Sequence, residues 1–134
     1  MSAYAHALRR SWFHLSADYR VHERLMQIKE SIDLLLGYVH GYDEESFVAD
    51  DKTVDAVVKR FEWVGECVKR LPVDVRTAYP HVPRREAAAF RDVLVHNYGR
   101  VDRRLLWKTI RRDLPEFAEQ FRPMLEGWER RNPQ

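Results

Sequence analysis

The segment RDVLVHNYGRVDRRLLW, positions 91 to 107, brings together the residue types needed for proton transfer beside a phosphate. It carries Arg91, Asp92, His96 and Tyr98 within a few positions. A histidine exchanges protons near neutral pH, and an arginine stabilises negative charge that develops on a phosphate. Asp92 precedes His96 by four residues, so on a helix its carboxylate can reach the imidazole and fix its orientation. The spacing therefore predicts an acid–base site.

Helix geometry sets a condition on this site. On an ideal helix, Arg91 and His96 diverge by about 140° around the axis, so one straight helix cannot aim both at a small target. Two solutions remain open: the helix ends between Asn97 and Gly99 and turns His96 round, or a second copy of the chain completes the site. A histidine on a helix is more often structural or exposed than catalytic, so the pattern needs further support.

Positive charge is concentrated around the same segment. Between Arg84 and Arg112 the chain has nine Lys or Arg and three acidic residues, whereas its overall net charge is +2. Binding of a nucleic acid is largely electrostatic, so this band indicates a phosphate-bearing partner. The alternative is a solvated helix face. The residues that we predict to contact the phosphates of such a partner are Arg84, Arg85, Arg100, Arg103 and Arg104.

Length and composition indicate one globular domain. The chain has 134 residues, of which 45% are hydrophobic and 33% charged. No apolar run approaches the roughly 20 residues that span a bilayer, so we expect no membrane association and a cytoplasmic location. The single cysteine, Cys67, excludes an intramolecular disulfide and is expected to be a small buried hydrophobe.

A metal site is the weakest of the alternatives. Asp50, Asp51 and Asp55 lie close together, and the chain has six histidines. However, no two histidines have the i, i+4 spacing that places two ligands on one face of a helix. Asp50 and Asp51 are also suited to cap the helix that follows them. We therefore expect neither a metal nor another cofactor.

Apolar residues recur with helical spacing along nearly the whole chain, which predicts an all-α antiparallel bundle of four or five helices. Residues 1–17 are expected to be an irregular N-terminal extension, residues 18–130 the helical domain and residues 131–134 a tail. The expected helices cover residues 18–40, 51–71, 84–97, 103–113 and 115–130, with single helical turns within 41–50 and 74–79. Gly41 is expected to end the first helix, Asp102 to begin the fourth and Pro115 to open the last.

The helix over residues 51–71 has an aromatic residue outside its apolar stripe. At 100° per residue, Trp63 lies about 140° from the centre of the stripe formed by its valines and Phe61. Such a residue indicates a second contact surface. This surface is either an interface with another subunit or a core that wraps around the helix.

Arg91-x4-His96-x-Tyr98 resembles the Rx4HxY signature of the HEPN superfamily, and more closely the chain resembles its HepT-like toxins. The resemblance covers roughly residues 18–125. It includes Asp55-Ala56, Val64-Gly65-Glu66-Cys67, the connector YPHVP, Val101-Asp102, Trp107 and Asp113-Leu114-Pro115. Two departures are Arg84, where the family usually has Trp, and Cys67 in place of Ala.

The resemblance implies a metal-independent endoribonuclease that is the toxin of a toxin–antitoxin pair. It implies a homodimer in which Arg91 and His96 of both chains line one cleft. There a ribose 2′-OH attacks the adjacent phosphate and leaves a 2′,3′-cyclic phosphate. His96 is the implied general acid or base, Arg91 stabilises the phosphorane, and Asp92 and Asn97 support them.

The partner implied by the resemblance is a minimal nucleotidyltransferase (MNT) antitoxin, which transfers AMP from ATP to Tyr98. A phosphate two residues from His96 would occupy the place of the substrate, and its charge would repel RNA from the cleft. The remaining alternative is a non-catalytic helical adaptor that binds a nucleotide or RNA without cleaving it.

Overall fold

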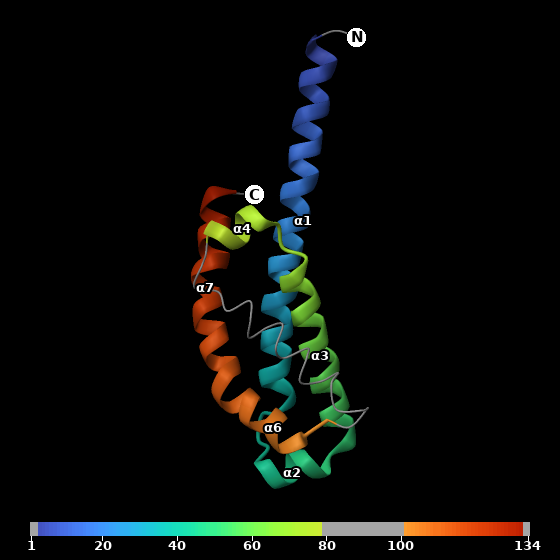
Figure 1. The fold of residues 1–134 in the computed structure, drawn as a ribbon, viewed down its shortest axis with the longest axis vertical. Helices are drawn as coiled ribbons and strands as arrows, with labels where there is room; N and C mark the ends of the chain where they lie inside the picture. The colour runs from blue at the N-terminus through green and yellow to red at the C-terminus, as the bar shows by residue number, and fades with distance from the viewer. Residues whose placement is uncertain (1–2, 79–100, 133–134) are drawn as a thin grey trace.

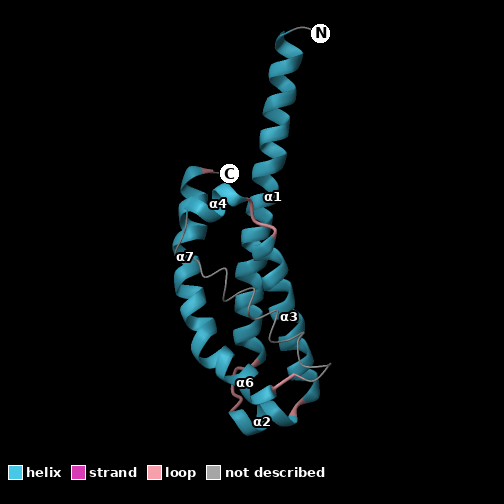
Figure 2. Cartoon of the chain, in the orientation of Figure 1, coloured by secondary structure: helices cyan, strands magenta, loops and turns pink. Residues whose placement is uncertain are grey.

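The computed structural model describes the backbone of residues 3–78 and 101–132, and within these ranges the side chains from Arg20 onward. All regular structure in these ranges is helical (Figures 1 and 2), which confirms the all-α prediction for them. The helix predicted over residues 84–97 lies outside the described residues. The elements are α1 (Ala3–Tyr38), α2 (Glu44–Ala49), α3 (Asp51–Lys69), α4 (Val73–Ala78), α6 (Arg103–Lys108), the π-helical turn η1 (Thr109–Asp113) and α7 (Leu114–Arg131).

Three long helices, α1, α3 and α7, lie side by side and form the body of the molecule (Figure 1). Both α3 and α7 run antiparallel to α1, as the sequence predicts. The short helices α2 and α6 pack together at one end of the bundle, and α4 lies at the other. No helix in the described ranges combines the length and the apolar character needed to cross a membrane.

The core is formed by the apolar stripes of the long helices. Its most deeply buried side chains are Leu25, Ile28, Leu35, Phe47, Val57, Phe61, Val64, Cys67, Ile110, Leu114, Phe117 and Met124. Cys67 is fully buried, as predicted for a small apolar side chain. Trp63 is partly buried and packs against the same core, which favours the interpretation that the core wraps around α3. Pairing of two copies stays a prediction.

The first helix is longer than the sequence suggested. It begins at Ala3, so the prediction of an irregular lead-in before residue 18 was wrong. Residues 3–17 are rich in Ala, Leu and Arg and contain neither Gly nor Pro, so their propensity carries the helix onward. Apolar periodicity reveals a packed face rather than the helix itself, and this part of α1 extends beyond the other helices in Figure 1.

The turns at the end of the bundle follow their sequence signals. Gly41 has a φ of +80°, a conformation that favours glycine, and it follows the last turn of α1 as predicted. Asp43 caps α2, because its Oδ1 accepts a hydrogen bond from the Ser46 backbone N–H at 2.8 Å. The Ser46 hydroxyl oxygen in turn accepts from the Asp43 N–H at 3.0 Å, which completes a capping box.

The last two predicted helices are joined into one. Asp102 caps α6 as expected, with its Oδ1 accepting from the Leu105 N–H at 3.1 Å. We expected a break before Pro115, but the helix continues through the π-helical turn Thr109–Asp113 into α7. This turn adds a residue to the helix, and Pro115 then falls in the first turn of α7, where a missing N–H is tolerated.

Phe47 links the short helices to the core, because its ring lies 5.2 Å from that of Trp107 and is fully buried. Phe47→Ala should lower the free energy of unfolding by about 3–5 kcal/mol, since it removes a buried ring and leaves a cavity. Urea denaturation followed by circular dichroism measures this. Leu36→Ala is the control, because Leu36 is 42% exposed. Similar losses in the two variants would contradict the assignment of Phe47 to the core.

Candidate functional site

The predicted acid–base residues lie outside the described residues. They are Arg91, Asp92, His96, Asn97 and Tyr98, together with the RNA-contact candidates Arg84, Arg85 and Arg100. Their convergence therefore stays a prediction. The structure does place the described residues on either side of them: α4 ends at Ala78 at one end of the bundle, and Val101 leads into α6 at the other (Figure 1).

The chain is firmly anchored just after the predicted site. Val101 is partly buried against the core, and Asp102 fixes the start of α6. Trp107 is 9% exposed and packs on Phe47, while the Arg111 guanidinium lies 5.4 Å from the centre of the Trp107 ring. The segment that contains His96 is therefore followed at once by chain held in the core.

Arg103 and Arg104, both predicted to contact RNA, are already engaged within the chain. Arg103 donates to the Val48 carbonyl oxygen at 2.7 Å, and its Nη2 lies 2.8 Å from the Asp51 carboxylate. Arg104 donates to Glu45 Oε1 at 2.9 Å. The hydrogen bond and charge of Glu45 raise the pKa of Arg104. These pairs fasten α6 to α2 and α3, so RNA must compete for the two guanidinium groups.

Two of the three aspartates considered for a metal, Asp50 and Asp51, are engaged with other side chains. Asp50 caps α3, and its carboxylate accepts from the Tyr42 hydroxyl at 2.5 Å and the Thr53 hydroxyl at 2.9 Å. The Tyr42 hydrogen bond is the main cause of the lowered pKa of Asp50. Asp51 pairs with Arg103. Within the described ranges, no three acidic, histidine or cysteine side chains are grouped so as to hold a metal ion.

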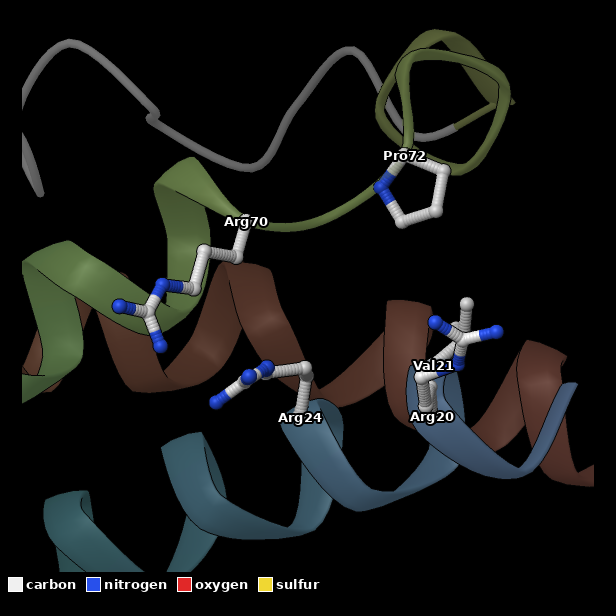
Figure 3. Close-up of a pocket in the computed structure, with 5 residues that line it drawn as sticks. All are labelled: Arg20, Val21, Arg24, Arg70 and Pro72. Carbon is white, nitrogen blue, oxygen red and sulfur yellow. The ribbon is translucent and has the colours of Figure 1, made fainter. Parts of the chain in front are cut away.

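A basic pocket that the sequence did not reveal lies between α1 and the end of α3. Its volume is about 400 Å³, and its described lining residues are Arg20, Val21, Arg24, Arg70 and Pro72 (Figure 3). The i, i+4 spacing of Arg20 and Arg24 was a visible signal. The sequence does not indicate that Arg70 lines the same pocket, because only the packing of α1 against α3 brings it there.

The protein-family model described as "Ribonuclease HepT-like" matches residues 28–124. A "probable ribonuclease HepT" of Thermococcus cleftensis is 39% identical over 97 residues, which cover 72% of this chain and 88% of that protein. A "putative RNase" of Methanocaldococcus jannaschii is 34% identical over 105 residues, which cover 78% of this chain and 87% of the relative.

A third relative is a longer protein. This "gamma-glutamylcyclotransferase and putative RNase" of Methanocaldococcus jannaschii is 36% identical over 102 residues, or 76% of the present chain. The matched part spans 46% of that relative's length. No solved structure matches the chain significantly. The descriptions of all three relatives contain the word ribonuclease or RNase.

The lowered pKa of Asp50 gives a pH prediction. Because the pKa is lower in the folded state, the stabilisation is complete above the ordinary carboxyl pKa of about 3.9 and is lost as the pH falls through the folded value. Asp50→Asn retains a capping oxygen but does not titrate. The urea midpoint of the wild-type protein should therefore fall more between pH 6 and pH 3 than that of Asp50→Asn.

The matched control is Asp33→Asn, which removes an exposed i, i+4 pair with Lys29. It should keep the wild-type dependence on pH. An equally steep loss of stability in Asp50→Asn and wild type would show that the Asp50 carboxylate does not contribute to the acid sensitivity of the fold.

Proposed function

This chain belongs to the HepT-like ribonuclease family, and on that premise we propose that it is a metal-independent endoribonuclease that acts through Arg91 and His96. One observation carries the proposal: the family match over residues 28–124 includes the whole Arg91-x4-His96-x-Tyr98 pattern. The residue types fit the reaction, since a histidine can move protons and an arginine can bind phosphate at neutral pH.

The proposed reaction is a transesterification. The ribose 2′-oxygen attacks the adjacent phosphorus and loses its proton to the imidazole of one His96. The bond from phosphorus to the 5′-oxygen breaks, and a protonated imidazole donates a proton to that oxygen. The products are a 2′,3′-cyclic phosphate and a 5′-hydroxyl. Arg91 stabilises the negative charge on the phosphorane, and Asp92 and Asn97 orient and support the imidazole.

A dimer provides the two histidines and resolves the difficulty of helix geometry. Because Arg91 and His96 diverge by about 140° on a straight helix, one chain does not readily aim both at the same phosphate. Two chains related by a twofold axis each present an Arg91 and a His96 to a shared cleft. The twofold axis also supplies one imidazole as base and the other as acid.

The proposed regulation is transfer of AMP from ATP to Tyr98 by an MNT antitoxin. The Tyr98 hydroxyl attacks the α-phosphorus of ATP, loses its proton, and pyrophosphate leaves. The phosphodiester that results brings negative charge within two residues of His96. It repels the substrate backbone and occupies its place, so the modified toxin is inactive. The chain itself needs no cofactor, because the partner uses the ATP.

Purified protein should cleave single-stranded RNA in the presence of EDTA. His96→Ala should reduce the cleavage rate about 10²–10⁴-fold, the usual contribution of a general acid or base. Gel electrophoresis of an end-labelled RNA measures the rate, and mass spectrometry identifies the 2′,3′-cyclic phosphate. His40→Ala is the matched control, since His40 is exposed at the end of α1.

Circular dichroism and size-exclusion chromatography show whether the His96→Ala protein keeps its fold and oligomeric state. Full activity in this variant would falsify the catalytic assignment of His96. Activity that disappears with EDTA supports a metal-dependent reaction instead. Tight binding of RNA without cleavage by the wild-type protein identifies the chain as a non-catalytic adaptor.

Incubation with an MNT nucleotidyltransferase and ATP should add AMP to a peptide that contains Tyr98, and RNA cleavage should fall in step with the modification. Tyr98→Phe removes the acceptor hydroxyl and should block both effects. Tyr42→Phe is the control, because its hydroxyl is engaged with Asp50. Peptide mass spectrometry locates the AMP. Modification confined to another residue contradicts the proposed role of Tyr98.

A further inference from the structure

The basic pocket between α1 and α3 concentrates positive charge in one hollow. Three of its five described lining residues are arginines: Arg20 and Arg24 come from α1, and Arg70 comes from the end of α3. None of these five residues carries a carboxylate. The arginines thus come from two segments that are far apart in the sequence and are brought together by the packing of α1 on α3.

Figure 3 shows how the three side chains are arranged. Arg24 and Arg70 extend from different helices toward the same side, while Arg20 lies at the other end of the pocket beneath Pro72. Arg24 Nη1 donates to Gln27 Oε1 at 3.2 Å. The same oxygen accepts from the Cys67 thiol at 3.7 Å. Arg24 is therefore held beside the point where α1 and α3 meet.

The charges of Arg24 and Arg70 both act on the buried thiol of Cys67. Burial raises the pKa of this thiol, and the charges of Arg24 and Arg70 both act in the opposite direction. Arg70 Nη2 is 3.8 Å from Glu66 Oε2, which is a long ion pair.

We propose that this three-arginine pocket binds a backbone phosphate of the RNA substrate, at a subsite distinct from the residues proposed for catalysis. The inference rests on the proposed ribonuclease function. Guanidinium groups bind phosphate oxygens through paired N–H donors, and a guanidinium has five such donors. A volume of about 400 Å³ is large enough for a nucleotide unit, and Pro72 gives the pocket an exposed apolar edge.

An RNA phosphate that occupies this pocket is attracted by the arginines that line it. The pocket lies where α3 ends and the chain turns into α4 (Figure 3). The pocket thus binds by charge and is expected to be indifferent to base sequence, as is typical of phosphate contacts.

The test uses the full chain with His96→Ala, so that bound RNA is not cleaved. Fluorescence anisotropy with a single-stranded RNA oligonucleotide gives Kd over a range of salt concentrations. In this background, Arg24→Gln with Arg70→Gln should reduce the slope of log Kd against log salt by about 0.7, as expected for one lost single-strand phosphate contact. The same loss corresponds to roughly fivefold weaker binding at about 0.1 M salt, when the affinities at 1 M salt are taken as equal.

Two further variants separate charge from structure. Arg24→Lys with Arg70→Lys keeps both charges and should retain most of the salt dependence. Arg122→Gln is the matched control, because Arg122 is an exposed arginine on α7 paired with Glu119. It should change Kd less than twofold. An unchanged slope in the double Gln variant, or an equal loss in the double Lys variant, overturns the phosphate assignment.

Three ligands identify the source of the phosphate. The effect of the Gln substitutions should vanish with an oligonucleotide whose backbone is uncharged methylphosphonate. If inorganic phosphate or AMP binds the pocket while RNA affinity is the same in the double Gln variant and the control, the pocket serves a small ligand and the RNA assignment is wrong.

The same measurements separate this inference from the proposed function. A wild-type protein that neither binds nor cleaves RNA overturns both. A wild-type protein that cleaves RNA, with the double Gln variant binding as tightly as Arg122→Gln in the His96→Ala background, overturns the pocket alone.

Discussion

The packing of α1 against α3 is the contact on which the rest of the described structure depends. Each helix buries an apolar stripe, and Leu25, Ile28, Phe61 and Val64 are almost completely removed from solvent along these stripes. Burial of such a side chain contributes about 1.5–3 kcal/mol, so a few turns of this seam outweigh any single surface ion pair. The seam also fixes the relative position of Arg24 and Arg70, and with them the shape of the basic pocket.

A second set of contacts holds the opposite end of the bundle. There Phe47 and Trp107 pack together, and Arg103 connects α6 to the Val48 carbonyl and the Asp51 carboxylate. The charges lie at the edge of an apolar contact, where they orient α6 more than they stabilise it. Because α6 begins just after the segment that carries His96, this end of the bundle determines the direction in which the chain leaves the proposed catalytic residues.

Much of this architecture could be predicted because its causes are local. Apolar spacing gave the core face of α3, and the side chains of Asp50 and Asp102 marked helix starts because each accepts a hydrogen bond from a backbone N–H three residues later. The early start of α1 was missed, since helix propensity by itself leaves no periodic signal. Pro115 was read as a break, because the π-helical turn that accommodates it has no equally plain signature.

The candidate functional residues differ in the same way: some could be predicted from the sequence, and others only from the folded structure. The spacing of Arg91, Asp92, His96 and Tyr98 indicates chemistry because the four residues are neighbours in the sequence. The pocket formed by Arg24 and Arg70 joins two helices, so only tertiary structure reveals it.

This difference also changes how the charge of the chain is interpreted. The basic stretch from 84 to 112 has a local balance far above the net +2 of the chain, yet Arg103 and Arg104 are neutralised by Asp51 and Glu45 from another part of the sequence. A linear count of charges therefore overstates what α6 offers to a polyanion. The opposite holds for α1 and α3, whose sequences show no comparable excess but whose packing gathers three arginines around one hollow. Because an RNA strand responds to the potential in space, the folded arrangement decides where its phosphates bind.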